Sequence, residues 1–295
     1  MKAKLIISLA IVAAFAALAS SCKAEKLFND NSTGTVEYSC TAPFEGKTLL
    51  IHYHIPEGDA SKMPVQIVMH GMGRNGDGYR DAWIPKSDEY GFIVIVPTIS
   101  DEEFGEEQYQ QGSVVDGEGN YVSRDEMTYV LVDRVFDFFV RHSSSKARSY
   151  NIYGHSAGAQ FVHRYLMFND APKVDVAVAA NSGWYTFPDE EVAYPYGIKE
   201  GIEKAGVDLE KYYGRNMTIL LGDADTLRTS NLRQTPESDL QGLNRLERGN
   251  NFYEFCKNDA ERRGYQFNWK KSYVSGSNHS NNKMAPVAAD VIYAK

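Results

Sequence analysis

Cysteine, positive charge and long apolar stretches are all scarce in this sequence. Its 295 residues include three cysteines, so at most one disulfide bond is available, and whether Cys40 and Cys256 form it depends on a Cα separation that the sequence does not give. Acidic residues number 39 against 31 basic ones, for a formal net charge of −8, which would repel a nucleic-acid backbone. The apolar fraction of 43% and charged fraction of 24% are those of an ordinary globular protein, so a disordered or fibrous chain is excluded.

The one long apolar stretch lies near the N-terminus, from Leu5 to Leu18, after Lys2 and Lys4. Its fourteen residues are too few for a membrane-spanning helix, which needs about 20. A basic start, an apolar centre and the small residues 19–21 predict a signal peptide over residues 1–21. We therefore expect an exported protein, and the loss of both lysines on cleavage would change the net charge from −8 to −10.

Cys22 directly follows the small residues, an order similar to the lipobox of bacterial lipoproteins, although Ala19 stands where that motif has leucine. Lipidation would also block a thiol that would otherwise be exposed to oxidation outside the cytoplasm. We expect Cys22 to carry lipid and residues 22–34 to form a polar tether, so that the protein is anchored at the bacterial cell envelope and meets the membrane only through that lipid. The alternative is an ordinary cleavage site followed by an incidental cysteine.

Residues 35–295 are predicted to form one domain of the α/β class. Short β-branched runs alternate with helical patterns and no internal repeat is present, which is typical of a mostly parallel central sheet with helices on both faces. Several predicted strands are apolar almost throughout, as strands covered on both faces are. The predicted strands are residues 48–55, 65–69, 92–96, 150–153, 174–180, 217–221 and 267–274.

Helices are predicted over residues 125–142, 156–168 and 249–264. The first has apolar side chains at helical spacing, and the third ends in two arginines before a glycine. Residues 183–214, by contrast, have no regular period and are rich in aromatics and prolines. A long irregular segment inside a compact domain is usually functional, so we expect this excursion to lie near a binding site.

The pentapeptide Gly154-His155-Ser156-Ala157-Gly158 has the Gly-x-Ser-x-Gly pattern of a nucleophile elbow. About one chain in ten of this length would contain the pattern by chance. The position of the pattern relative to the predicted strands and helices therefore decides whether it is a nucleophile elbow. It follows an apolar strand and opens an amphipathic helix, the strand-turn-helix placement that exposes a serine above a sheet. We therefore predict that Ser156 is a nucleophile; the alternative is a glycine-rich turn with an incidental serine.

Acyl transfer by a serine also needs N–H donors for the developing oxyanion. A predicted strand ends in His70-Gly71-Met72-Gly73, a glycine-rich turn that can present a backbone N–H. We assign the oxyanion hole to the N–H groups of Met72 and Ala157. His70 is expected to orient the turn without transferring protons.

An acid and a base would complete the site, in the chain order serine, acid, histidine. The strand that begins at Met217 is followed by Asp223 and Asp225, which are both candidate acids. Of the seven histidines, only His279 comes after them, in a polar loop beyond the last predicted strand. Because a strand end can carry that loop toward Ser156, His279 is the predicted base.

With these residues the chain resembles the α/β-hydrolase superfamily, and within it the exported serine esterases similar to poly(3-hydroxybutyrate) depolymerases and feruloyl esterases. The similarity covers residues 48–284 and is carried by the motifs above and by longer strings. These strings are residues 71–74 with 83–85, 154–161, 180–185, and 222–226 with 235–237. The resemblance implies an α/β-hydrolase fold with a Ser156–His279–Asp225 triad, since the acid of this superfamily lies a few residues past the glycine that closes its strand.

The resemblance further implies hydrolysis of a small or polymer-attached carboxylic ester through an acyl-enzyme, with no metal or organic cofactor. Trp184 and Tyr185 of the excursion, and Trp83, are candidate substrate contacts, although a loop with its own small core would use the same side chains. Two alternatives stay open: a non-catalytic, glycan-binding surface lipoprotein on a hydrolase shell, and a peptidase with the same triad.

Overall fold

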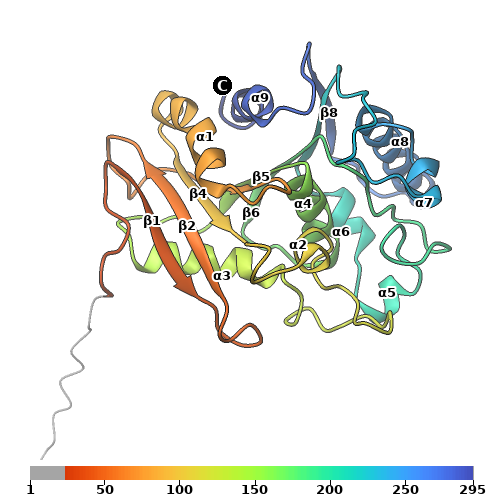
Figure 1. Ribbon diagram of the computed structural model, residues 1–295, viewed down its shortest axis with the longest axis horizontal. Helices are drawn as coiled ribbons and strands as arrows, with labels where there is room; N and C mark the ends of the chain where they lie inside the picture. The colour runs from red at the N-terminus through yellow and green to blue at the C-terminus, as the bar shows by residue number, and fades with distance from the viewer. Residues whose placement is uncertain (1–23, 295) are drawn as a thin grey trace, which may run out of the picture.

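The computed structural model describes residues 24–294, which fold around one eight-stranded sheet (Figure 1). The strand order is β1-β2-β4-β3-β5-β6-β7-β8, in which β2 is antiparallel to both neighbours and β3 to β8 are parallel. The strands are β1 (Ser32–Ser39), β2 (Thr48–Ile55), β3 (Val65–Met69), β4 (Ile93–Thr98), β5 (Tyr150–His155), β6 (Val174–Ala180), β7 (Met217–Gly222) and β8 (Lys270–Val274). The predicted fold class, a mostly parallel sheet of the α/β-hydrolase type, is confirmed.

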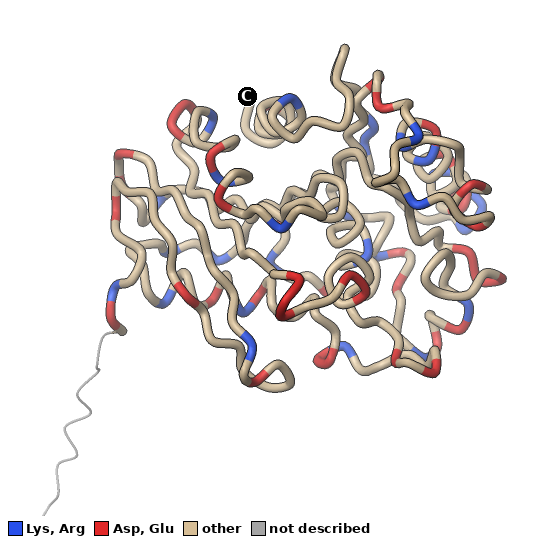
Figure 2. The backbone as a smooth tube through the Cα atoms, in the orientation of Figure 1, with Lys and Arg blue, Asp and Glu red and all other residues tan. Residues whose placement is uncertain are grey.

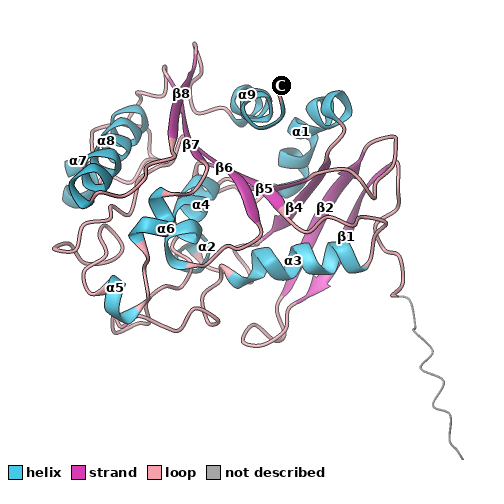
Figure 3. Cartoon of the chain, turned by 180° about the vertical axis from the view of Figure 1, so that it is seen from behind, coloured by secondary structure: helices cyan, strands magenta, loops and turns pink. Residues whose placement is uncertain are grey.

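Helices cover both faces of this sheet (Figure 1, Figure 3). One face is covered by α1 and α9, and the other by α3, α4, α6 and α8. The helices are α1 (Gly76–Tyr90), α2 (Glu106–Gln110), α3 (Val130–Arg141), α4 (Ala157–Phe168), α5 (Gly201–Lys204), α6 (Leu209–Tyr213), α7 (Pro236–Leu240), α8 (Arg245–Arg263) and α9 (Asn281–Tyr293).

Alternate residues of each central strand supply two separate apolar layers. In β4, Ile93 and Ile95 belong to the larger layer, whereas Val94 and Val96 face α1 and α9. All four side chains are fully buried. Burial on both faces explains why these strands are apolar at every position and do not alternate with polar residues.

Three of the longer elements were not expected from the sequence, namely β1, α1 and α9, and neither were the short helices α2, α5, α6 and α7. β1 is an edge strand that alternates exposed and half-buried residues, so it has no apolar run. The helices α1 and α9 contain Pro85 and Pro286, and proline normally ends a helical pattern. The predicted helix at 125–142 is shorter than expected, because residues 124–128 form turns and bends before α3.

The predicted tether over residues 22–34 is too long. Phe28 is fully buried and packs edge-on against the ring of Tyr53. The backbone N–H groups of Leu27 and Phe28 donate to the carbonyl of His142. The folded domain therefore begins near Leu27 and not at residue 35. The apolar residues Leu27 and Phe28 attach this otherwise polar segment to the domain.

The remaining N-terminal predictions fall outside the described residues, namely the signal peptide over residues 1–21 and the lipidation of Cys22. Among residues 24–294, no helix is long and apolar enough to cross a membrane. Cys40 and Cys256 are both buried and free, so no disulfide bond joins them in this structure.

The predicted excursion is the connection between β6 and β7. It contains only the short helices α5 and α6. Its aromatic side chains fasten it to the helices of the domain: Tyr194 packs edge-on against Phe168 of α4, and Phe187 against Phe252 of α8. The excursion is thus an irregular segment with a fixed position beside α4.

Candidate active site

Ser156 lies on the turn between β5 and α4, in a strained backbone conformation. Its φ and ψ are 58° and −114°, a region that residues other than glycine rarely adopt. The turn closes only with glycine on either side. A Cβ on Gly154 would lie 2.1 Å from the carbonyl oxygen of Gly158, and a Cβ on Gly158 would lie 2.1 Å from that of Met69. The Gly-x-Ser-x-Gly pattern is therefore a steric requirement of this turn, which lifts the serine above the sheet.

A continuous chain of hydrogen bonds links Ser156 to residues that follow two other strands. Nε2 of His279 lies 2.8 Å from Oγ of Ser156, and Nδ1 of His279 lies 2.7 Å from Oδ2 of Asp225. Asp225 is only 3% exposed, whereas Ser156 and His279 are partly open to solvent. A carboxylate that accepts from Nδ1–H leaves Nε2 free to accept the serine proton, as general-base catalysis requires.

The two candidate acids after β7 take different positions. Asp225 contacts His279, whereas Asp223 is exposed and its Oδ1 accepts from the N–H of Gly276 at 2.7 Å. Asp223 therefore shapes the loop that carries His279. The carboxylate beside His279 is thus that of Asp225, the position expected from its distance to Gly222 along the chain.

Asn181, which the sequence analysis did not identify, joins the loop of the acid to the loop of the histidine. Its Oδ1 accepts from the N–H of Gly222 at 2.7 Å, and its Nδ2 donates to the carbonyl of Asn278 at 3.2 Å. Asn181 is buried and has a φ of 47°, in the left-handed region that asparagine tolerates better than most residues. Its one sequence signal was its position directly after an apolar strand.

The backbone N–H groups of Met72 and Ala157 are placed as possible oxyanion donors. Both residues line a cavity beside Ser156, and Ala157 is the first residue of α4, where helix geometry leaves the N–H without a partner. Within residues 24–294 neither N–H donates to a protein acceptor. A Cβ on Gly71 would lie 2.5 Å from the hydroxyl of Tyr79, so the turn can approach the serine only with glycine there.

Other histidines around the site are buried and neutral. In His70, Nε2 accepts from the N–H of Ile99 at 3.0 Å and Nδ1 donates to the carbonyl of Gly71 at 2.9 Å. Burial lowers the pKa of His70 to about 3, and it holds the pKa of His155 and of His163 well below the usual range. His70 thus has the orienting position expected for it, with no proton to exchange at neutral pH.

The three predicted substrate contacts lie in different surroundings. Trp184 lines a cavity beside Ser156. Tyr185 is fully buried in a stack with an aromatic ring of α8, and Trp83 is fully buried against Tyr153 in the layer under α1 and α9. The prediction that Tyr185 and Trp83 contact substrate is therefore wrong, because both are core residues.

Arg245, at the start of α8, is a buried cation beside the acid and was also missed. Its Nη1 lies 3.5 Å from Oδ1 of Asp225, and both side chains are 3% exposed. Burial lowers the pKa of the Arg245 guanidinium, and the charge of Asp225 opposes that shift. No motif in the sequence marks this arginine, because the contact joins two distant segments.

Two cavities flank Ser156. One has a volume of about 230 Å³ and is lined by His279, Tyr79 and Asn281 among others. The second has a volume of about 190 Å³ and is lined by Trp184, Arg233 and Arg245 among others. The residues that line both cavities are Met72, Ser156 and Asn231.

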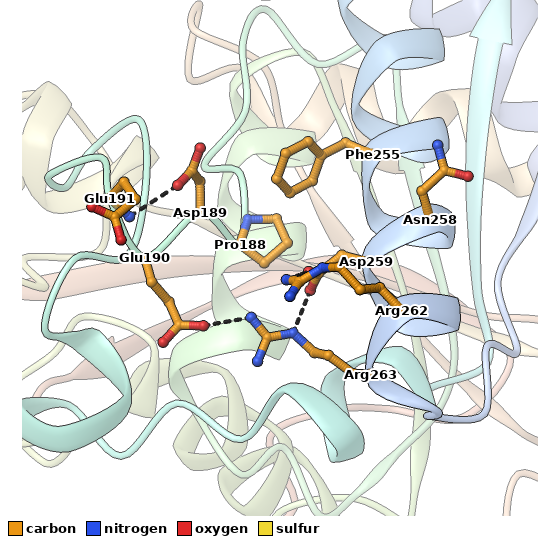
Figure 4. Close-up of a pocket in the computed structure, with 9 residues that line it drawn as sticks. All are labelled: Pro188, Asp189, Glu190, Glu191, Phe255, Asn258, Asp259, Arg262 and Arg263. Carbon is orange, nitrogen blue, oxygen red and sulfur yellow. Dashed lines mark hydrogen bonds and ion pairs between the residues drawn. The ribbon is translucent and has the colours of Figure 1, made fainter.

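A larger cavity of about 520 Å³ lies between α8 and the excursion and shares no lining residue with the other two (Figure 4). Its charged side chains pair with one another, since Arg263 donates to both Asp259 and Glu190. The largest of these three cavities is therefore not the one beside the candidate nucleophile. Within residues 24–294, no group of three or more His, Cys, Asp or Glu side chains is placed to hold a metal ion.

Comparison with solved structures gives two relatives at substantial identity. The chain is similar to poly(aspartic acid) hydrolase-1 from Sphingomonas sp. KT-1, with a TM-score of 0.82 and 38% identity over 90% of this chain and 100% of that one. It is similar to LpqC, a poly(3-hydroxybutyrate) depolymerase from Bordetella parapertussis, with a TM-score of 0.84 and 32% identity over 89% of each chain. The fluorophosphonate-binding serine hydrolase FphF of Staphylococcus aureus has the same fold, with a TM-score of 0.55 and 13% identity over 90% of this chain and 98% of that one. No family model and no curated protein matches the sequence.

A mostly parallel eight-stranded sheet with a serine on a strained strand-to-helix turn defines a hydrolase fold. The identities of 38% and 32%, over about 90% of the chain, show which family it belongs to. The chain belongs to the α/β-hydrolase superfamily, in the group that contains these two hydrolases, and the predicted resemblance to that superfamily and to poly(3-hydroxybutyrate) depolymerases is confirmed.

Proposed function

We propose that this protein hydrolyses carboxylic esters with Ser156 as the nucleophile. The observation that carries the proposal is the unbroken chain from Ser156 through His279 to Asp225, with separations of 2.8 and 2.7 Å. Ser156 attacks the ester carbonyl while Nε2 of His279 takes its proton, and the N–H groups of Met72 and Ala157 stabilise the oxyanion. The imidazolium then protonates the leaving alcohol, and a water molecule repeats the cycle on the acyl-enzyme.

Asp225 fixes the tautomer of His279 and stabilises the imidazolium that forms during each half of the reaction. Its burial supports this role, since a carboxylate shielded from water acts more strongly on a neighbouring charge. A non-catalytic glycan-binding module would have no need for this buried pair or for the strain at Ser156.

Amide hydrolysis is the second candidate, because the same triad serves both reactions. It is favoured by the similarity to an enzyme named for poly(aspartic acid), an amino-acid polymer, whereas the depolymerase LpqC is named for a polyester. Turnover of p-nitrophenyl acetate compared with that of peptide anilides separates the two candidates. Faster hydrolysis of the anilides would make the protein a peptidase.

Replacement of the nucleophile tests the proposal directly. Ser156→Ala is expected to lower kcat for p-nitrophenyl acetate by about 10⁴- to 10⁶-fold and to abolish labelling by a fluorophosphonate. Ser61→Ala, before β3 and so at the end of the sheet away from the elbow, is the matched control and should be labelled normally. Activity of Ser156→Ala within tenfold of the parent protein would refute the assignment.

Export and lipid attachment are also proposed, with residues 1–21 as signal peptide and Cys22 as the lipid-bearing residue. The support is the order of basic, apolar and small residues before the cysteine. Metabolic labelling with a fatty-acid analogue should mark the parent protein and not Cys22→Ser. Parent protein that is unlabelled and fractionates as soluble would contradict lipidation.

A further inference from the structure

If the protein hydrolyses esters as proposed, the two cavities beside Ser156 are placed to hold different halves of the substrate. His279 must deliver its proton to the leaving alcohol, and it lines the 230 Å³ cavity together with Tyr79 and Asn281. The 190 Å³ cavity lies on the side of Ala157 and is not lined by His279. The second cavity, called here the acyl cavity, is therefore where the acyl chain lies.

Trp184 lines the acyl cavity and lies under two guanidinium groups. The Cζ atom of Arg164 is 4.1 Å from the centre of its rings, and the Cζ atom of Arg233 is 4.8 Å from it. Each contact with the ring is favourable. The two cations nevertheless repel each other, and the charge of Arg233 adds to the effect of burial in lowering the pKa of Arg164.

Arg164 is fully buried in α4 without a carboxylate partner among the residues described. Its hydrogen bonds go to the Thr186 hydroxyl at 2.7 Å, the Gln110 carbonyl at 2.8 Å, and the backbone carbonyl and side-chain oxygen of Gln160, both at 3.3 Å, which are all neutral. Its Nη2 has no hydrogen-bond partner. A buried cation without a counter-charge is costly, so an anion beside Trp184 would be stabilised.

Arg233 enters the acyl cavity from the loop after β7 and forms no salt bridge with the residues described. The pKa of the exposed Glu237 is lowered by hydrogen bonds and, to a smaller extent, by the charge of Arg233. The Nε of Arg233 donates to the hydroxyl of Tyr196 at 2.8 Å, and within residues 24–294 its two Nη groups make no hydrogen bond. By contrast, the buried Arg248 nearby pairs with Asp239 at 3.0 Å. The only carboxylate that lines the acyl cavity is that of Glu106, which is exposed.

This cationic pair is not part of a general basic surface. Figure 2 shows Lys and Arg interspersed with Asp and Glu over the part of the chain that the structure describes, and the formal net charge of the sequence is −8. Two arginines that form no salt bridge, both in contact with a tryptophan that lines a cavity beside the nucleophile, are therefore a local feature. Such clusters in a pocket favour a ligand of opposite charge.

We infer that the acyl cavity binds a carboxylate, so that the preferred substrates are half-esters of dicarboxylic acids or chains built from such units. The free Nη groups of Arg233 bind the carboxylate, and Arg164 strengthens the positive potential from the protein interior. Hydrolysis consumes one water molecule, breaks the acyl–oxygen bond and releases the alcohol and the free diacid. This assignment rests on the proposed function, since Ser156 and His279 define which cavity holds the acyl chain.

The test compares two p-nitrophenyl esters with equal numbers of acyl carbons, the hydrogen glutarate and the pentanoate. Spontaneous hydrolysis, measured with Ser156→Ala, is subtracted. The parent protein should favour the anionic ester in kcat/KM by tenfold or more. Arg233→Gln should lower this preference by about ten- to hundredfold, as expected for loss of a charge-assisted hydrogen bond. The control is Arg148→Gln, which removes the same charge from an exposed position before β5 and should leave the preference unchanged.

A parent protein that hydrolyses the pentanoate at least as well as the glutarate would overturn the inference while leaving the esterase function intact. An equal preference in the parent and in Arg233→Gln would also overturn it. If neither ester is hydrolysed, the proposed function fails, and calorimetry with glutarate alone decides the binding site. Binding that is weakened by Arg233→Gln and not by Arg148→Gln supports the site, and absence of binding refutes it.

Discussion

The two sides of Ser156 are built from different parts of the fold. On the side of the proton transfer, Ser156 follows β5, Asp225 follows β7 and His279 follows β8, so parallel strands of one sheet fix their separations. On the acyl side, Trp184 and Arg233 come from long connections and are held by contacts between side chains. The sheet therefore fixes the positions of the proposed catalytic residues, whereas the residues proposed to select the acyl chain lie on loops that can vary without disturbing the sheet.

The side of the proton transfer is tested by replacing each of its two candidate acids separately. Asp225→Asn should lower kcat by about 10²- to 10⁴-fold with little change in thermal stability, because the amide no longer fixes the tautomer of His279. Asp223→Asn should keep most of the activity and cost about 1 kcal/mol of unfolding free energy through a weaker bond to Gly276. Steady-state kinetics and thermal unfolding of both variants are the measurements. Loss of activity in Asp223→Asn and not in Asp225→Asn would exchange the assignments.

Arg245 joins the two sides, since it lines the acyl cavity and lies 3.5 Å from Asp225. We expect it to act as a positioning residue that partly neutralises the acid and so limits the stability of the imidazolium. Arg245→Gln should therefore move the acid limb of the kcat/KM profile upward by about one pH unit, and Arg245→Lys should move it less. Arg262→Gln, an exposed position at the end of the same helix, is the control. A profile that stays in place while only KM rises would assign Arg245 to substrate binding.

The smallest expected effect is on the pH dependence of stability, through the hydrogen bond that attaches the excursion to α4. Nε2 of His163 accepts from the N–H of Thr186 in the excursion at 3.1 Å, and burial holds the pKa of His163 well below its usual range. Below about pH 6.5 the unfolded chain takes up a proton that the folded chain does not, so the free energy of unfolding falls as the pH falls. His163→Gln should reduce this dependence by about 1.4 kcal/mol per pH unit between pH 6 and 5. Urea titrations at several pH values measure the slope, and an unchanged slope would mean that His163 is protonated in the folded protein.

The catalytic side was predictable from the sequence because each of its residues lies within the first few positions after a strand of the sheet. Ser156 lies in a local pattern, and the order of acid and histidine follows from the topology of the sheet. The acyl side was not predictable, because Arg164 and Arg233 meet only after the excursion has folded back on α4. Aromatic content likewise did not distinguish Trp184, which lines the cavity, from Trp83, which lies in the core. A pattern along the chain does not give the direction in which such a ring points.

Phe28 would set the distance between the domain and a membrane if the proposed lipid on Cys22 is present. Its N–H bonds to His142 at the C-terminal end of α3, and α3 leads into the start of β5, so this attachment lies at the end of the sheet away from Ser156. If Cys22 carries the proposed lipid, the chain from Cys22 to Phe28 reaches at most about 20 Å when fully extended. A linker this short would keep the domain beside the lipid surface, with the end of the sheet that carries Ser156 facing away from the membrane. Substrate would then arrive from the surrounding fluid and not from the bilayer.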